Sequence, residues 1–225
     1  SLHKYHNNGE HNYNDFNFSD LLNVLIDLYE KFAINPLNNI LNNLEFGVNI
    51  VISYNPDLFI DNIIHIKGTE ISRIKDYQEN RVQGKFQRYI LKIYNKGLQN
   101  NQENYILRYE IKIMKAAHLK QFNVQNLYDV LKYDSLVLMG KYLTESFNDI
   151  VYWNPGINLK TLPIIERELL RDGRSYIFWN ELKKNQRKTY YYKLNNYKRL
   201  VNQYGVYPFN KIPDLISEKW KYLLS

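Results

Sequence analysis

The segments FQRYILKIYN (residues 86–95) and YILRYEIKIM (residues 105–114) decide the fold that this sequence predicts. In each of them, apolar residues alternate with charged or polar residues along most of the segment. This period of two is typical of strands that bury one face and leave the other face polar. Because only a short polar stretch, Gly97–Glu103, connects the two segments, we predict that they pair as an antiparallel hairpin.

The rest of the chain divides into a first half with strands and a second half with helices. Leu44–Ser53 repeats the period of two and predicts a third strand, and Ser1–Tyr5 also has the pattern of a strand. Apolar residues with helical spacing follow Asn17–Asp20, and Leu58–Ile66 predicts a short helix. In the second half, helices are predicted at 115–122, 126–133, 135–152, 162–171, 176–183, 186–204 and 213–223.

This order of elements predicts an α+β protein, in which an antiparallel sheet is followed by a helical C-terminal region. The breakers Asn154-Pro155-Gly156 place a boundary between a first domain, residues 1–153, and a second region, residues 154–225. The chain starts at Ser1 and not at Met, so we expect that an N-terminal segment of the first domain is missing.

The composition excludes several classes of protein. The 225 residues include no cysteine, which rules out disulfide frameworks, thiolate zinc sites and cysteine nucleophiles. With 44% apolar residues and no apolar run of the roughly 18 residues that a membrane span needs, we expect a globular protein without a membrane partner. The lack of cysteine also favours a reducing, cytoplasmic location.

The positive charge of the chain is concentrated at its C-terminal end. The formal net charge is +7, with 30 basic and 23 acidic residues, and the whole excess lies in residues 181–225. Such an asymmetry favours a polyanion partner, most simply nucleic acid. A solvated helical face explains the same charges, and the charge alone does not decide between the two.

The polar face of the three predicted strands carries side chains that can bind a metal ion or take part in catalysis. It carries the carboxylates Glu45 and Glu110, the phenol of Tyr94 and the cations Lys92, Lys96, Arg108 and Lys112. Carboxylates from two strands are common ligands of Mg²⁺ or Mn²⁺, and His118, in the helix that follows, is placed to reach the same site. Tyrosine is a covalent nucleophile when a metal or a cation favours its phenolate. The alternative is an ordinary solvent-facing sheet surface.

Two motifs in this hairpin resemble a known family. IYNKGLQ (93–99) followed by ILRYEIK (106–112) resembles the IYxKG and LRxE core of rolling-circle replication initiators, with the phage and plasmid gene II/X family as the nearest match. The resemblance extends to residues 107–131, which contain LKQF and NLYD, to LEFGVNI (44–50), and to the opening SLHKYHNNGEHNYNDF. It therefore touches most of residues 1–135.

The resemblance implies a Rep-type catalytic domain, of the HUH or ferredoxin-like kind, that nicks one strand of a replication origin. Tyr94 matches the tyrosine that attacks the phosphodiester, stays bound to the 5′ phosphate and releases a 3′-OH primer, and Lys96 matches the lysine two positions on. Glu45 and Glu110 match the acidic positions of a metal-dependent site, which makes Mg²⁺ or Mn²⁺ the expected cofactor; His118 is a candidate ligand only by its place in the helix that follows.

An initiator of this kind also needs DNA contacts outside the reacting groups, and the charge of residues 181–225 suggests where part of them lie. Origin DNA, single-stranded or supercoiled, is the expected partner, and a host helicase is a second one. The expected phosphate contacts are Lys92, Arg108 and Lys112 near the cleaved bond and Lys183, Lys184, Arg187, Lys188, Lys193, Lys198 and Arg199 in the basic region. Two alternatives stay open: an origin-binding protein without catalysis, and a structural α+β module whose charges only contact water.

Overall fold

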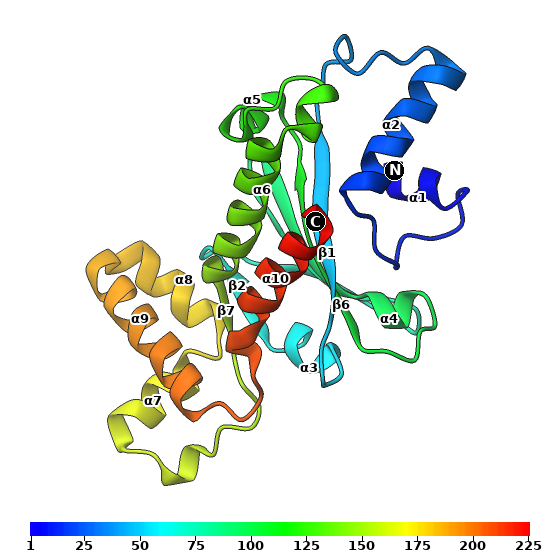
Figure 1. The fold of residues 1–225 in the computed structure, drawn as a ribbon. Helices are drawn as coiled ribbons and strands as arrows, with labels where there is room; N and C mark the ends of the chain where they lie inside the picture. The colour runs from blue at the N-terminus through cyan, green and yellow to red at the C-terminus, as the bar shows by residue number, and fades with distance from the viewer.

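A computed structural model describes residues 1–225, and its centre is a five-stranded antiparallel sheet (Figure 1). The strand order is β1-β6-β5-β4-β3, with β1 at one edge and β3 at the other. The strands run at β1 Leu44–Val51, β3 Ser72–Lys75, β4 Asn80–Lys85, β5 Tyr89–Asn95 and β6 Ile106–Ile113. A separate two-stranded sheet pairs β2 (Ile63–Ile66) with β7 (Ile150–Tyr152). The predicted α+β class and the antiparallel hairpin are confirmed.

The register of the sheet separates its two faces. In antiparallel pairs, residues directly opposite each other point to the same face. Glu110 of β6 stands opposite both Gly47 of β1 and Lys92 of β5, and Arg108 stands opposite both Asn49 and Tyr94. The alternate residues of the same strands are almost all apolar and buried, so one face is polar and the other belongs to the core.

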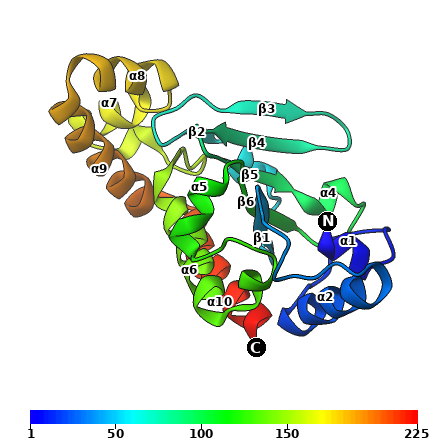
Figure 2. The same cartoon turned by 90° about the horizontal axis from the view of Figure 1, so that it is seen from above.

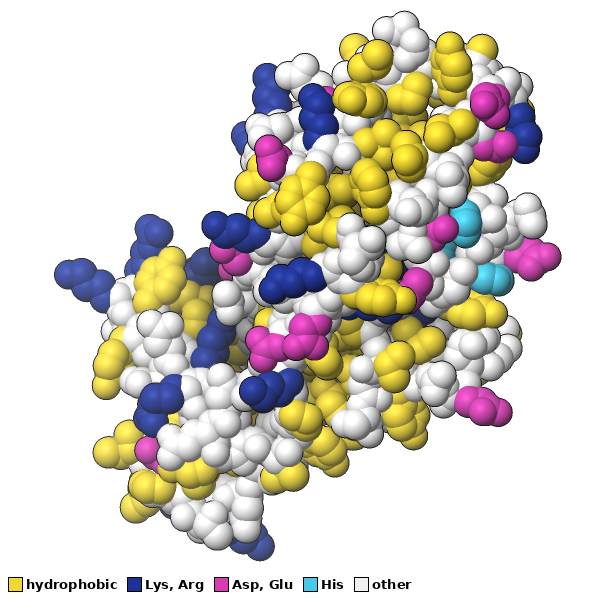
Figure 3. All heavy atoms as spheres, viewed as in Figure 1, with side chains coloured by type: hydrophobic (Ala, Val, Ile, Leu, Met, Phe, Trp, Pro, Cys, Tyr) yellow, Lys and Arg dark blue, Asp and Glu magenta, His cyan; other side chains and the backbone are white.

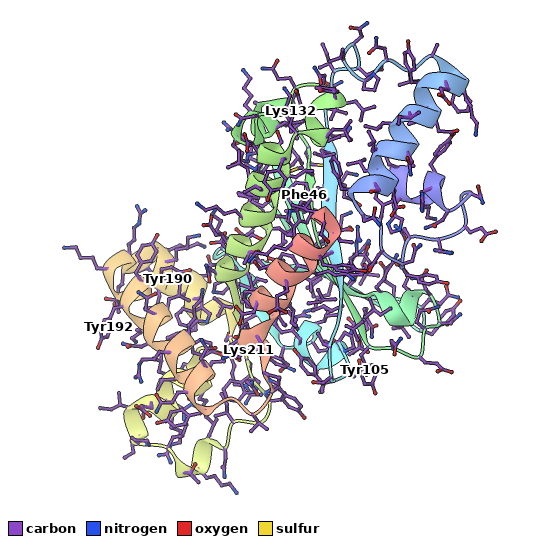
Figure 4. All side chains as sticks on the ribbon, in the orientation of Figure 1. Phe46, Tyr105, Lys132, Tyr190, Tyr192 and Lys211 are labelled. Atoms are coloured by element: carbon purple, nitrogen blue, oxygen red, sulfur yellow. The ribbon has the colours of Figure 1, made fainter.

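Two helices cover the apolar face of the sheet. Helices α6 (Tyr133–Glu145) and α10 (Ile212–Leu224) lie side by side over it (Figures 1 and 2). The ring of Trp220 lies 6.0 Å from that of Phe46, and its Nε1 donates to the carbonyl of Leu136, which ties α10 to both β1 and α6. Figure 4 labels Phe46 at this junction. One hydrophobic cluster of 40 buried residues runs through the sheet and these helices.

The N-terminal residues lie beside the β1 edge. Helix α1 (Leu2–His6) and helix α2 (Phe18–Phe32) are joined by a loop that reaches the polar face of the sheet. Asn17 caps α2 in a capping box with Asp20, as the sequence indicates. The remaining short helices are α3 (Asp57–Ile60), α4 (Lys96–Gln99), α5 (Ala116–Leu119) and five 3₁₀ turns at 120–122, 128–131, 146–149, 159–161 and 209–211.

Helices α7 (Ile164–Asp172), α8 (Tyr176–Asn185) and α9 (Arg187–Tyr204) form a lobe at the opposite end of the molecule from α1 and α2 (Figures 1 and 2). Its centre is Trp179, fully buried, whose indole donates to the carbonyl of Gly173 and whose ring lies 5.3 Å from that of Tyr197. Helix α10 then returns to the sheet. The segment after the predicted boundary at residue 153 therefore supplies both this lobe and a layer of the sheet domain.

Several predicted elements differ from the observed ones. The opening residues form helix α1 and not a strand. The helix predicted at 58–66 ends at Ile60 and gives way to β2, and the one predicted at 135–152 ends as β7. Both replaced segments are short apolar runs that are buried in the β2–β7 pair, and such runs do not distinguish strand from helix by periodicity. None of the helices combines the length and the apolar character that a membrane span requires.

Candidate active site on the polar face of the sheet

Glu110 is the centre of the polar face. Its side chain is 3% exposed, and three groups surround its carboxylate. The ammonium of Lys92 lies 3.0 Å from Oε1, while Nε of Arg108 lies 2.8 Å and the hydroxyl of Tyr94 lies 3.2 Å from Oε2. Burial alone would raise the pKa of Glu110, but the adjacent cations Arg108 and Lys92 outweigh burial and hold its pKa below the ordinary value of 4.5. The carboxylate is therefore charged at neutral pH.

A glycine makes room for this carboxylate. Gly47 stands opposite Glu110 in the register of β1 and β6. A Cβ at residue 47 would lie 2.5 Å from Cβ of Glu110 and would also meet the carbonyl oxygen of Tyr109, which is closer than real Cβ atoms approach. The close approach of the two strands at this point therefore requires glycine.

Tyr94 shares the site but is covered. Only 7% of the residue is exposed, and its hydroxyl donates to Glu110. Burial raises the pKa of Tyr94 well above its ordinary value of 10; Arg108 opposes this rise and Glu110 adds to it. The hydroxyl is therefore protonated at neutral pH, and a nucleophilic role requires both that the proton leaves and that the cover opens.

Lys96 lies beside Tyr94, 5.6 Å from the centre of its ring. Lys96 is 4% exposed and donates to the side-chain oxygens of Asn12 and Gln99, both at 2.8 Å. Burial, with Arg108 adding to it, lowers the pKa of Lys96 to about 8. An amine with this pKa is partly neutral just above physiological pH and can exchange a proton there.

The loop between α1 and α2 covers this part of the face. Asn49, opposite Arg108, donates through Nδ2 to the backbone carbonyls of Asn12 and Tyr13 and accepts from Nη1 of Arg108. Together with the Lys96–Asn12 hydrogen bond, these contacts join residues 36 to 84 positions apart. The sequence held no signal for Asn12 because a loop that crosses a sheet leaves no periodic pattern.

A cavity of about 660 Å³ opens along β1, between α2 on one side and α6 and α10 on the other. Its wall is mainly apolar, with Leu28, Phe46 and Trp220 among its residues, and Arg108 and Asn12 line its polar part. Figure 3 shows hydrophobic side chains on the surface around α2 on this side of the molecule. The cavity has the size and the mixed character of ligand pockets in general.

His118 does not belong to this site, in contrast to the prediction. The chain leaving β6 turns onto the apolar face, and α5 places the imidazole there. The ring stacks on Tyr89 with centroids 5.2 Å apart, and Nε2 lies 3.1 Å from the hydroxyl of Tyr142. Tyr89 alternates with Lys92 and Tyr94 along β5 and points to the opposite face, so the sheet separates His118 from Glu110. Burial lowers the pKa of His118, which keeps it neutral at pH 7.

The remaining donors do not fit the expected Mg²⁺ or Mn²⁺ ion. Glu45 and Glu110 do approach each other, but the ammonium of Lys92 lies between them, 2.8 Å from Oε2 of Glu45 and 3.0 Å from Oε1 of Glu110. The other oxygen of Glu110 is paired with Arg108. No three His, Asp or Glu side chains gather closely enough to hold a metal ion. We therefore derive no chemical step through a metal.

The predicted cations of the C-terminal region fall into two groups. Four of them have partners within the protein: Lys183 donates to the backbone at Gly68, Lys193 lies over the ring of Phe178, Lys198 donates to the carbonyl of Asn148, and Arg199 pairs with Gln203. The other three form no ion pair and are exposed at the turn between α8 and α9. They are Lys184, Arg187 and Lys188.

The two predicted binding regions are not adjacent. The α8–α9 turn belongs to the lobe at the far end from α1 and α2, whereas the Glu110 site lies under the loop that joins those two helices (Figures 1 and 2). Lys112, predicted beside Glu110, lies on the same sheet face, directly across from Glu45 in the pairing of β1 with β6. It is half-buried and makes no ion pair. A DNA that contacts both regions would have to extend along the molecule.

Comparison with known proteins adds no relative: no family model, no curated protein and no solved structure matches this chain. The function is therefore inferred from the site and from the motifs of the sequence.

Proposed function

We propose that this protein is a rolling-circle-type replication initiator that binds origin DNA and cleaves one strand with Tyr94. One observation supports this proposal above the others: the hydroxyl of Tyr94 donates to Glu110 at 3.2 Å, within a cluster that also holds Arg108. A phenol paired with a carboxylate and flanked by cations is the arrangement that activates a tyrosine toward a phosphodiester. The IYNKG and LRYE motifs supply the same residues to the resemblance described above.

The proposed step needs only groups of this chain and the DNA. Glu110 accepts the phenolic proton as Oη of Tyr94 attacks phosphorus, and the bond between phosphorus and the 3′ oxygen breaks. The 3′ oxygen then takes a proton, either from Glu110 or from the ammonium of Lys96, and leaves as a 3′-OH. The 5′ phosphate stays on Tyr94 as a phosphotyrosyl ester, and the guanidinium of Arg108 balances the negative charge that builds on the phosphoryl oxygens.

A second function has an observation of its own. Tyr94 is 7% exposed and its pKa is raised, so in the conformation described here it is neither reachable nor ionised. These properties favour an origin-binding protein without catalysis. The two functions share the DNA partner and differ in a single outcome, cleavage of the strand.

The experiment that separates the two functions compares two tyrosines of the protein strand β5. Supercoiled plasmid carrying the replicon's own origin is incubated with the parent protein, with Tyr94→Phe and with Tyr89→Phe. Tyr89 serves as the matched control because it lies on β5 as well but faces the core. Relaxed circles with covalently bound protein are expected from the parent and from Tyr89→Phe, and at least a hundredfold fewer from Tyr94→Phe. Equal nicking by Tyr94→Phe would rule out the assigned nucleophile, and binding without nicking by the parent would favour the second function.

A further inference from the structure

We propose that Lys92 is the resident cation of the Glu45–Glu110 pair, and that this pair binds no divalent metal ion. Lys92 holds this place whether or not the protein cleaves DNA. The resemblance predicts Mg²⁺ or Mn²⁺ at the same place, and the position of one ammonium group opposes that prediction.

Lys92 bridges the two carboxylates. Its Nζ lies 2.8 Å from Oε2 of Glu45 and 3.0 Å from Oε1 of Glu110, and its side chain is only 15% exposed. A divalent ion shared by these carboxylates would need this same position, because hard cations bind carboxylate oxygens at about 2.0–2.6 Å. The ammonium and the metal therefore exclude each other.

The backbone fixes this arrangement. Lys92 stands directly opposite Glu110 in the pairing of β5 with β6, so the cation is delivered by the strand register. Arg108, two residues before Glu110 on β6, shares its face and occupies the second carboxylate oxygen at 2.8 Å. Glu110 thus has a cation on each oxygen before any ion arrives, and a metal that bridges the two carboxylates would have to displace Lys92 within a buried site.

The charge of the cluster opposes a metal as well. Two carboxylates, Glu45 and Glu110, face three cations, Lys92, Lys96 and Arg108, which leaves the cluster formally positive. A divalent cation entering such a cluster is repelled, whereas an anion such as a phosphate is attracted. Arg108 uses Nε for Glu110 and Nη1 for Asn49, and its remaining donor hydrogens are available to an anion at the polar part of the cavity.

The test is a titration with Mn²⁺, in which electron paramagnetic resonance measures the free ion. The proteins are the parent, Glu45→Gln, Lys92→Met and the double variant Lys92→Met/Glu45→Gln. Methionine keeps most of the length of the lysine stem and removes its charge. The parent and Glu45→Gln should bind Mn²⁺ equally weakly, while Lys92→Met should gain one site at least tenfold tighter. The double variant should lose that gained site.

Three results would overturn the proposal. The first is a tight Mn²⁺ site in the parent that Glu45→Gln abolishes. The second is a folded Lys92→Met protein, checked by circular dichroism, that gains no site. The third is a gained site that survives in the double variant. If Lys92→Met does not fold, the parent and Glu45→Gln still decide, because the Glu45 side chain is 39% exposed and its substitution should leave the fold intact. These readouts need no DNA, so failure of the nicking proposal leaves them unaffected; if nicking occurs, it should persist in chelator.

Discussion

Glu110 lies at the centre of the candidate site, and its charged surroundings determine the predictions at the scale of single residues. Its carboxylate is buried, and two cations and a phenol converge on it. Substitution of one partner in a buried ion pair leaves the other charges without compensation, which is far more costly than removal of a surface pair.

The first prediction concerns stability at this residue. Glu110→Gln should lower the free energy of unfolding by about 3–5 kcal/mol, because Lys92 and Arg108 then lack their shared counter-charge in a buried site. Urea denaturation followed by circular dichroism measures the change. Glu45→Gln is the matched control: its carboxylate pairs with the same lysine but is much more exposed, and it should cost less than about 1 kcal/mol. Similar decreases in the two variants would contradict the central place of Glu110.

A pH dependence follows from the same carboxylate. The pKa of Glu110 is lower in the folded protein than its ordinary value of 4.5, so the folded state binds the proton less tightly than the unfolded state. The stabilisation is therefore complete above about pH 4.5 and disappears as the pH falls through the lower folded pKa. Denaturation midpoints between pH 3 and 7 should fall more steeply with acid in the parent than in Glu110→Gln. Parallel curves would contradict this assignment.

Alternation along the strands placed most of these side chains correctly. Lys92, Tyr94 and Glu110 fall on one face because the period of two follows from the geometry of the backbone. His118 was misplaced because nothing in the sequence tells toward which face the chain turns after β6. The burial of Tyr94 was equally hidden, and so was the partner of the neighbouring Lys96, which comes from a loop more than 80 positions away.

At the scale of the elements, the pairing of β1 with β6 depends on Gly47. A side chain at this position collides with the backbone of β6 and with Glu110, so β1 would have to move away from the sheet. Gly47→Ala should therefore destabilise the protein by about 1–3 kcal/mol, the usual range for overpacking. Thermal unfolding measures it, with Val51→Ala on the same strand, at 64% exposure, expected within about 0.5 kcal/mol of the parent. An unchanged melting temperature for Gly47→Ala would show that the two strands are less tightly held.

The elements that the sequence predicted well are those with a long, clear period. β1, β5 and β6 and helices α7 to α10 match within a few residues, because each has one apolar side facing the core. β3 and β4 were not predicted: β3 is the exposed edge strand, and β4, between β3 and β5, buries Asn80, Val82 and Gly84, of which only Val82 has an apolar side chain, so neither offers a strong signal. β2 and β7 are largely buried, which removes alternation altogether.

At the scale of the whole molecule, the exposed cations of the C-terminal region lie far from the Glu110 site. The net charge of +7 was predicted to serve DNA binding by the C-terminal region, and only three of its predicted cations are free for that role. Tyr192, which Figure 4 shows on α9, is 71% exposed, whereas Tyr190 is buried, so stacking on bases from this helix is restricted to its outer side.

The prediction at this scale is a salt dependence of DNA binding. Replacing Lys184, Arg187 and Lys188 by Gln should weaken binding at every sequence and reduce the slope of log affinity against log salt by about 0.9 for each phosphate that the variant no longer neutralises. Fluorescence anisotropy with single-stranded and duplex DNA measures both. Lys115→Gln with Lys120→Gln is the control, because these exposed cations lie outside the lobe. A slope that stays the same in the triple variant would exclude the α8–α9 turn from the DNA interface.

The ion pair between Asp15 and Lys219 can form only after the last helix, α10, has been synthesised. The two residues lie 204 positions apart and their charged atoms 2.7 Å apart, so the loop over the polar face is fastened partly by the last helix. During synthesis, all the strands emerge from the ribosome before α10 does, and the Glu110 cluster can assemble from β1, β5 and β6 while Asp15 still lacks its partner. The ion pair that fastens this loop to α10 is therefore the last of its contacts to form, after the hydrogen bonds of Asn12 and Tyr13 to the sheet have their partners.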